Sequence, residues 1–327
     1  MAGTLRVAIV GCGAIVTLHQ LPALRRCSSL QVVGLVDRDR EWSAKVARRF
    51  GVPAAHDDYR QLIGKVDAVL IATPNTTHAT IACDLLEQGI HVLCEKPLAT
   101  TGEEVERMLA AAVRGNVRLM TAHCLRFSPQ LEALKAVVDA GWLGPVERVS
   151  ASIGGPYEGV ACRTDFRRQR ALSGGGVLMD LGVHVLDLAV WIAGRAPAHV
   201  EYAGAFASGW EVETDAEVGL RFPGDGQASL QASFSTPLGN SFTVRGTRGW
   251  ARASLYVPTE LTVFGEDARI CRRAGMQTLH LVDRNMYDAQ IAHFCHAVAT
   301  GEPFRVRDAE VRATIGVIDS CYGRMAA

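Results

Sequence analysis

The sequence predicts an α/β protein of two domains: a doubly wound parallel sheet, followed by an α+β domain with a large, mainly antiparallel open sheet. The chain has 327 residues, which is more than a single hydrophobic core usually serves. Up to about residue 122 short apolar runs alternate with helical segments, whereas the later part contains many short strands separated by turns. We therefore place the domains at residues 1–123 and 124–327.

The first domain should contain parallel strands that are buried on both faces. Its apolar runs are nearly continuous, as expected where helices cover both sides of a sheet. The expected strands are Leu5–Val10, Gln31–Val36, Val66–Ala72, Ile90–Cys94 and Val117–Thr121. The helix after the first strand should pack through Leu18, Leu21 and Leu24, which recur at helical spacing.

The second domain should combine alternating strands with a few helices. The expected strands include Val146–Ile153, Glu217–Phe222, Ala228–Ser235, Phe242–Gly246 and Trp250–Leu255. The expected helices are Pro129–Ala140, a segment from the glycine triplet at 174–176 to about Ala193, Asn285–Thr300 and Arg307–Arg324. A sheet without helices on both faces favours packing against another subunit, so we expect a homodimer or homotetramer through this sheet.

Composition and charge exclude several classes of partner. Lys plus Arg equals Asp plus Glu at 34 each, with no basic block or aromatic-basic stripe for nucleic acid or an anionic membrane. We expect no membrane span, because no apolar run approaches the roughly 20 residues that one requires. The nine cysteines are scattered without metal-binding spacing, so we expect reduced thiols and no metal. With no leader before the first strand, we expect a cytoplasmic protein with a small-molecule partner.

A glycine loop after the first strand indicates a dinucleotide site. In Gly11-Cys12-Gly13-Ala14-Ile15, the two glycines permit a tight turn and a close approach of a pyrophosphate to the following helix N-terminus. The third glycine of the usual pattern is replaced by Val16. We expect this change to affect the packing of the helix on the sheet more than the contact with the phosphate.

An acidic residue at the end of the second strand bears on the choice of cofactor. Asp37 lies about 20 residues past the glycine loop, where a carboxylate accepts the adenosine ribose hydroxyls. A carboxylate there repels a 2′-phosphate, which favours NAD, although the neighbouring Arg38 partly offsets that repulsion and leaves NADP open.

The next strands end in polar loops on the same edge of the sheet. Thr73-Pro74-Asn75, with His78 nearby, follows one strand, and Glu95-Lys96-Pro97 follows the next. Ligands of open α/β sheets bind outside the carboxyl ends of the strands. Lys96 is one of only four lysines among 34 basic residues, and a lysine in a partly desolvated pocket can exchange a proton near neutral pH. A surface lysine without function is the alternative.

A second cluster lies on the helix after the glycine triplet. Asp180 and His184 are four residues apart and Asp187 follows three later, so all three should share one helix face. An imidazole beside a carboxylate is a tuned general base, although such neighbours are also often simple ion pairs. Together with Lys96, this cluster offers a base and a cation for oxidation of an alcohol.

These motifs resemble the glucose–fructose oxidoreductase, inositol dehydrogenase and rhizopine catabolism family (Gfo/Idh/MocA). The matching segments are Val10–Ile15, Ala72–Asn75 with His78, Glu95–Leu98, and Gly174–Gly176 with Asp180, His184 and Asp187. The resemblance implies a Rossmann domain and catalytic roles for three residues. Lys96 would contact the reacting hydroxyl and the nicotinamide ribose, Asp180 would orient the substrate, and His184 would act as acid or base. It also implies a cis peptide bond before Pro97.

The resemblance also implies a cofactor site and a substrate class. The expected cofactor contacts are Gly11, Cys12, Gly13, Ala14, Ile15, Asp37, Arg38, Thr73, Pro74, Asn75, His78, Glu95 and Lys96. The expected reaction is hydride transfer between NAD(P) and a secondary hydroxyl or keto group of a sugar, amino sugar or cyclitol. The expected substrate contacts are Arg126, Tyr157, Arg163, Asp165, Phe166 and Arg167.

Three alternatives remain at this stage. The Ala- and Arg-rich, Lys-poor composition suggests a high-GC genome, and with it an aminoglycoside or another secondary-metabolite sugar. A catalytically silent sugar- or dinucleotide-sensing protein on the same fold is the rival from another class. A family member that acts on a non-sugar, such as a dihydrodiol or a tetrapyrrole, is the enzymatic rival.

Overall fold

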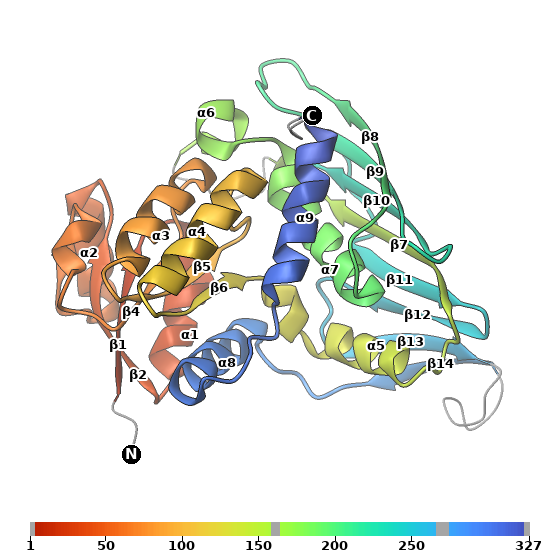
Figure 1. The fold of residues 1–327 in the computed structure, drawn as a ribbon, viewed down its shortest axis with the longest axis horizontal. Helices are drawn as coiled ribbons and strands as arrows, with labels where there is room; N and C mark the ends of the chain where they lie inside the picture. Colours follow the sequence, from red (N-terminus) through yellow and green to blue (C-terminus); the bar gives the residue numbers. More distant parts are fainter. Residues whose placement is uncertain (1–3, 158–163, 266–274, 324–327) are drawn as a thin grey trace.

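The computed structural model describes residues 4–157, 164–265 and 275–323. Two sheets lie side by side with helices between them, one in the N-terminal part and one in the C-terminal part of the chain (Figure 1). The N-terminal sheet has the strand order β3-β2-β1-β4-β5-β6, and all of its pairs are parallel. Its strands are β1 (Leu5–Val10), β2 (Leu30–Val36), β3 (Ala55–His56), β4 (Ala68–Ile71), β5 (His91–Glu95) and β6 (Leu119–Ala122).

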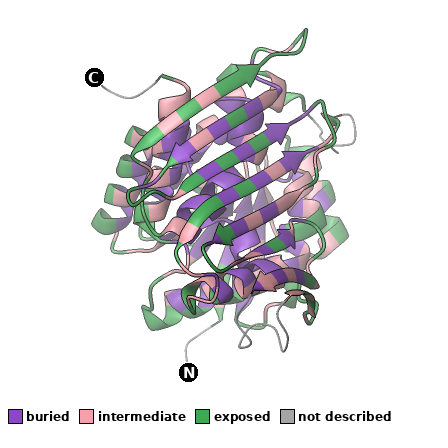
Figure 2. Cartoon of the chain, turned by 90° about the vertical axis from the view of Figure 1, so that its right-hand side faces the viewer, coloured by how far each residue is buried: buried purple, intermediate pink, exposed green. Residues whose placement is uncertain are grey.

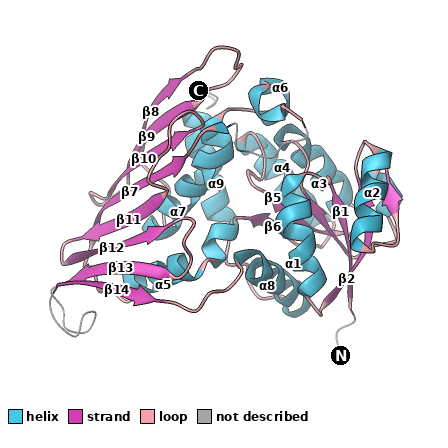
Figure 3. Cartoon of the chain, turned by 180° about the vertical axis from the view of Figure 1, so that it is seen from behind, coloured by secondary structure: helices cyan, strands magenta, loops and turns pink. Residues whose placement is uncertain are grey.

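Helices cover both faces of this sheet, which confirms the doubly wound arrangement. The helices are α1 (Leu21–Arg26), α2 (Arg40–Phe50), α3 (His78–Leu86) and α4 (Gly102–Arg114). Seen from behind, α1 lies in front of the strands while α3 and α4 lie beyond them (Figure 3). Strands in this position are apolar throughout, as in β4, where all four residues are buried.

The C-terminal sheet has the order β14-β13-β12-β11-β7-β10-β9-β8. Only the pair β7 and β10 is parallel, so the sheet is mixed and mainly antiparallel, as expected. Its strands are β7 (Val146–Gly154), β8 (His199–Ala205), β9 (Asp215–Arg221), β10 (Gln227–Ser233), β11 (Ser241–Gly246), β12 (Gly249–Ser254), β13 (Glu260–Gly265) and β14 (Gly275–His280).

One face of this sheet is covered and the other is open. The helices of this half are α5 (Pro129–Asp139), the short α6 (Arg170–Ser173), α7 (Val183–Ala193), α8 (Met286–Thr300) and α9 (Asp308–Cys321). Helices α5, α7 and α9 contact strands of the sheet from one side. Buried and exposed residues alternate along the strands, because successive side chains point to opposite faces (Figure 2). The exposed side chains therefore lie on the open face.

The last two helices pack across the boundary predicted at residue 123. Arg26 of α1 pairs with Asp288 of α8 at 2.5 Å, and Arg312 of α9 pairs with Glu106 of α4 at 2.5 Å. The N-terminal domain therefore contacts the end of the chain as well as the segment that directly follows it.

Three local features differ from what the sequence predicted. Leu18 is 59% exposed, because Val16–Gln20 forms a π-helical turn that changes which side chains face the sheet. The short strand β3 was not expected, since two residues carry no periodic pattern. Among the described residues, Arg170–Ala193 is long and apolar enough to cross a membrane by composition, yet 72% of its most apolar window is buried inside the protein. This segment contains α6, a π-helical turn at Leu178–Gly182 and α7, inside the second domain.

Candidate active site

The glycine loop has the geometry that a dinucleotide requires. Gly11 has a φ of +96°, and a Cβ there would lie 2.3 Å from the Ala72 carbonyl oxygen, so only glycine fits. A Cβ on Gly13 would meet nothing within 4 Å, so the packing of the chain itself does not demand this glycine. An approaching pyrophosphate would explain it. The half-buried Ala14 and Ile15 begin the helix that follows, where free N–H groups favour an anion.

Asp37 is held where a ribose would lie against the glycine loop. Its Oδ2 accepts from the Cys12 N–H at 2.9 Å and its Oδ1 from the Asp39 N–H at 3.0 Å. Each oxygen keeps a lone pair for a hydroxyl. Arg38 beside it is exposed. Val16, at the third glycine position, is fully buried within the π-helical turn, so the helix packs on the sheet without that glycine.

The loop after β4 joins neighbouring segments instead of lying freely open. Thr73 and Pro74 are half-buried at the strand end. The Asn75 amide donates to the Ser173 carbonyl at 2.8 Å, which ties this loop to α6. His78 is fully buried, with its ring nitrogens 2.9 Å from the carbonyl oxygens of Thr73 and Pro97. This placement corrects the expected cofactor contact of His78: the ring holds the two loops together.

Lys96 stands at the end of β5, in the loop predicted to carry chemistry. The Lys96–Pro97 peptide bond is cis, as expected. The preceding Glu95 is buried, and its Oε1 accepts from the Gln20 amide at 2.5 Å. Burial raises the pKa of Glu95, and the Gln20 hydrogen bond opposes that rise. Glu95 thus lies under the lysine and bonds to the helix that follows the glycine loop.

Lys96 and Asp180 join the two halves of the site. The Lys96 Nζ donates to the Asp180 carbonyl oxygen at 2.7 Å and to its Oδ1 at 2.9 Å. The Arg167 Nε donates to Asp180 Oδ2 at 2.7 Å. Burial alone would raise the pKa of the Asp180 carboxyl, but the charges of Lys96 and Arg167 lower it below its usual range. Asp180 is therefore an anion held between two cations.

His184 lies one turn beyond Asp180, after a π-helical turn that sequence spacing did not reveal. Residues Leu178–Gly182 are π-helical and α7 begins at Val183. Such turns are frequent at functional sites because they re-aim side chains. Burial, and then the charges of Lys96 and His123, hold the pKa of His184 well below 6.5. The imidazole is neutral at pH 7 and can accept a proton.

Asp187 and Arg126 form a buried pair behind the site. The Arg126 Nε and Nη2 donate to Asp187 Oδ2 and Oδ1 at 2.8 and 2.7 Å, and Nη1 also contacts Glu310. The Arg126 side chain is fully buried. The structure therefore does not bring Arg126 to a substrate, which corrects that expectation. Asp187 also lies 3.4 Å from Nε2 of His123, which begins the segment 123–127 that was expected to line the substrate pocket and is instead buried beside Asp187.

The glycine triplet is held by Glu213 and Tyr322, two residues that no sequence pattern singled out. The buried Glu213 carboxylate accepts from the N–H groups of Gly176 and Leu178 at 3.1 Å. The Tyr322 hydroxyl donates to Glu213 at 2.5 Å. A Cβ on Gly176 would lie 2.0 Å from the Glu213 carbonyl oxygen, which explains the glycine. These contacts position the start of the turn that carries Asp180.

The other expected substrate residues that the structure describes have different surroundings. Phe166 lies under the Arg167 guanidinium, whose carbon is 4.8 Å from the ring centre. Tyr157 packs edge-on against Trp210, and its hydroxyl reaches Asp165 at 3.4 Å. Arg163 lies outside the described residues. Of this set, Arg167 contacts the Lys96 and Asp180 cluster directly.

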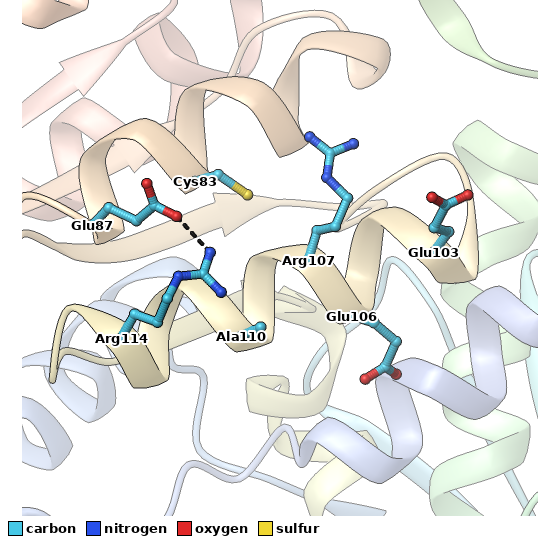
Figure 4. A pocket seen from close by; sticks show the side chains of 7 residues that line it. All are labelled: Cys83, Glu87, Glu103, Glu106, Arg107, Ala110 and Arg114. Carbon is cyan, nitrogen blue, oxygen red and sulfur yellow. Dashed lines mark hydrogen bonds and ion pairs between the residues drawn. The ribbon is translucent and has the colours of Figure 1, made fainter.

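Other features of the described surface lie apart from this cluster. A pocket of about 380 Å³ between α3 and α4 is lined by Cys83, Glu87, Glu103, Glu106, Arg107, Ala110 and Arg114 (Figure 4). None of these belongs to the strand-end loops. Within residues 4–157, 164–265 and 275–323, no three His, Cys, Asp or Glu side chains are grouped to hold a metal ion.

The parallel sheet, the glycine loop and a lysine at a strand end define an NAD(P)-dependent oxidoreductase. Residues 5–123 match the model of an oxidoreductase family with an NAD-binding Rossmann fold, and residues 131–252 match the GFO/IDH/MocA C-terminal domain. The chain belongs to the GFO/IDH/MocA oxidoreductase family, as the motifs indicated.

Sequence relatives include two groups of proteins. The chain is 33% identical to mouse (Mus musculus) trans-1,2-dihydrobenzene-1,2-diol dehydrogenase over 271 residues, covering 80% of this chain and 78% of the relative. It is 28% identical over 309 residues to an uncharacterised oxidoreductase, ORF334, of Rhizobium meliloti, covering 92% and 91%.

Solved structures share the whole fold. An aldose-aldose oxidoreductase from Caulobacter crescentus, complexed with glycerol, superposes with a TM-score of 0.88 at 25% identity, covering 98% of this chain and 97% of that one. A levoglucosan dehydrogenase in complex with NADH and levoglucosan gives a TM-score of 0.88 at 24% identity, covering 98% and 96%.

Proposed function

We propose that the protein transfers a hydride between NAD(P) and a secondary hydroxyl or keto group on a ring that carries a neighbouring hydroxyl, as in sugars, amino sugars and cyclitols. The observation that carries this proposal is the convergence of Lys96, Asp180 and His184 from the two domains. A cation, an anion and a neutral imidazole are the groups that oxidation of an alcohol needs.

The cofactor would be held by the glycine loop, Asp37 and the end of β5. When bound there, NAD(P) supplies a nicotinamide carbon that accepts or returns the hydride. We favour NAD, because the Asp37 carboxylate can accept from two ribose hydroxyls and would repel a phosphate.

The protein's own groups manage the proton and the developing charge. An ammonium group has three N–H donors, and two of those on Lys96 are used by Asp180. Within the described residues the third has no protein acceptor, so it can donate to the substrate oxygen and stabilise an alkoxide. The neutral His184 takes the hydroxyl proton. Asp180 accepts from both Lys96 and Arg167 and so holds the lysine side chain in place.

A dihydrodiol is the second candidate substrate class, favoured by the 33% identity to trans-1,2-dihydrobenzene-1,2-diol dehydrogenase. Such a diol shares with a sugar the adjacent hydroxyls on one ring. Tyr157 and Trp210, two half-buried rings beside Arg168, are aromatic groups that could pack on an apolar ring as well as on a sugar face. The aldose-aldose oxidoreductase at 25% identity supports the sugar class.

A panel of sugars, amino sugars, cyclitols and a trans-dihydrodiol, followed by NADH or NADPH absorbance, tests the proposal. We expect turnover with at least one ring diol. We also expect Lys96→Met and His184→Gln each to lower kcat by about 10²–10⁴, since each supplies acid–base or charge stabilisation. Binding of NAD with no turnover on the whole panel would favour a sensing protein. Intact turnover in both variants would refute the assigned roles.

We further propose a homo-oligomer formed through the open face of the C-terminal sheet, in the cytoplasm. Trp250, Phe264 and Met276 are neighbours on three adjacent strands of that face, and Met276 is 69% exposed. The centre of the face carries the small polar side chains of Ser150, Ser229 and Thr243. Because these side chains are short, a second sheet could pack closely against them.

A further inference from the structure

Four hydrogen bonds form a closed ring between the glycine loop and the start of α2. The Cys12 N–H donates to Asp37 Oδ2 at 2.9 Å, and the Asp39 N–H donates to Asp37 Oδ1 at 3.0 Å. The Trp42 N–H donates to Asp39 Oδ1 at 3.0 Å, and the Trp42 indole Nε1–H donates to the Cys12 carbonyl oxygen at 2.8 Å, which closes the ring. Both polar backbone groups of Cys12 are therefore held by the segment between β2 and α2.

The helix α2 has other contacts that hold it in place. The side chain of Asp39 caps its N-terminus, and two of its apolar side chains, Val46 and Ala47, are buried in the core. Trp42 itself is half-buried, and its indole N–H is directed to a carbonyl oxygen outside the helix. The indole bond therefore constrains the glycine loop more than it anchors α2.

The bond at the Cys12 carbonyl fixes the direction of the next N–H group in the chain. The cis peptide bond found among the described residues precedes Pro97, so the bond between Cys12 and Gly13 is trans. In a trans peptide unit the C=O and the N–H point in opposite directions. Because the Cys12 carbonyl points to Trp42, the Gly13 N–H points away from that side chain. No described residue accepts from this N–H, and a Cβ on Gly13 would meet nothing within 4 Å.

From this geometry we propose that Trp42 is a positioning residue for the pyrophosphate of the cofactor. Its indole N–H holds the Cys12 carbonyl toward α2 and so leaves the Gly13 N–H available to a phosphate oxygen at the helix N-terminus, where anions are favoured. Without the indole N–H this peptide unit can rotate, and cofactor binding then has to order it, which lowers affinity. The inference needs the family's cofactor, but neither the proposed substrate nor the roles of Lys96 and His184.

The ring of bonds predicts separate effects on two parts of the cofactor. Asp37 keeps its bonds to the N–H groups of Cys12 and Asp39 when the indole donor is removed. The carboxylate that would accept the ribose hydroxyls should therefore stay in place. The peptide unit between Cys12 and Gly13, in contrast, loses the bond that fixes its direction. Loss of the indole N–H should thus weaken binding of the pyrophosphate and leave binding of adenosine unchanged.

Isothermal titration calorimetry of the full-length protein, without substrate, tests the proposal. Trp42→Phe keeps an aromatic ring and removes the N–H donor. Trp142→Phe is the matched control, because Trp142 is also half-buried and no described residue accepts from its indole N–H. Each protein is titrated with NAD or NADP, whichever binds the unmodified protein more tightly, and with adenosine, which lacks the phosphates. Urea unfolding measures the stability of each variant.

We expect Trp42→Phe to bind the dinucleotide about 3–10-fold more weakly, which is the change expected from one lost hydrogen bond. Its affinity for adenosine should equal that of the unmodified protein, and Trp142→Phe should bind both ligands normally. Unchanged affinity of Trp42→Phe for the dinucleotide would overturn the proposal. An equal loss of affinity for adenosine would also overturn it, because it would indicate a general disturbance of the domain.

Solvent exchange of the indole protons in the unmodified protein, followed by nitrogen-15 NMR, decides the matter if Trp42→Phe does not fold. Phenylalanine variants of the other four tryptophans identify the Trp42 signal by elimination. The Trp42 proton should exchange more slowly with the dinucleotide bound than with adenosine bound, because the indole bond and the phosphate contact stabilise each other. Equal exchange with the two ligands would overturn the proposal. Failure of the proposed function is a separate result, since absence of turnover on the substrate panel would leave these binding measurements unchanged.

Discussion

Replacing Arg126 with methionine should destabilise the whole protein, although sequence alone placed this residue in the substrate site. Its guanidinium is fully buried and donates twice to Asp187, whose side chain is only 2% exposed. The methionine would fill most of the same space but would leave the carboxylate buried without its cation.

The size of the effect follows from burial. Breaking a buried ion pair by removing one partner costs about 3–5 kcal/mol, out of a total stability of about 5–15 kcal/mol for a typical protein. Removing both partners is often close to neutral, so Arg126→Met with Asp187→Leu should recover much of the loss. Arg312→Met is the matched control, because Arg312 forms the same kind of bidentate ion pair with Glu106 at the surface. There we expect about 0–1 kcal/mol.

Urea unfolding followed by circular dichroism and by tryptophan fluorescence measures these four proteins. The reasoning fails if Arg126→Met costs no more than Arg312→Met, or if the double variant is no more stable than Arg126→Met. A variant of normal stability that has lost only substrate affinity would instead restore the substrate role for Arg126.

Three further predictions concern the cofactor, the pH dependence and the assembly. Because burial and the Lys96 charge lower the pKa of His184, kcat/KM should stay level down to pH 6.5 and fall only below it; an acid limb above pH 7 would contradict this. Asp37→Ser should weaken NAD about tenfold and improve NADP in fluorescence titrations, and tighter NADP binding by the unmodified protein would reverse our choice. Trp250→Arg with Phe264→Arg should lower the mass seen by light scattering; a monomer before mutation would exclude the proposed interface.

The parts of the site that sequence predicted are those set by local pattern. Gly11 and Lys96 each follow a strand whose apolar run is plain, and the carboxyl ends of parallel strands must meet at one edge. Asp180 and His184 could be placed on one helix for the same reason. Local spacing did not reveal that a π-helical turn separates them, because helical periods of neighbouring length are not distinguishable over one turn.

The parts that sequence missed depend on partners far along the chain. Arg126 meets Asp187 and Glu310, which lie 61 and 184 residues away. Glu213 reaches Gly176 from a loop before β9, and Tyr322 reaches it from the end of α9. No periodicity or turn rule links such residues, so a buried arginine was taken for a ligand contact.

The contact of Tyr322 with Glu213 has a consequence for synthesis of the protein. The N-terminal sheet can fold during translation, since its strands lie within the first 122 residues. The turn that carries Asp180 is held by Glu213, and Glu213 by Tyr322, one residue before the last described residue. The turn therefore gains these contacts only after synthesis has passed Tyr322, so a nascent chain that stops earlier lacks the support of the turn that carries Asp180.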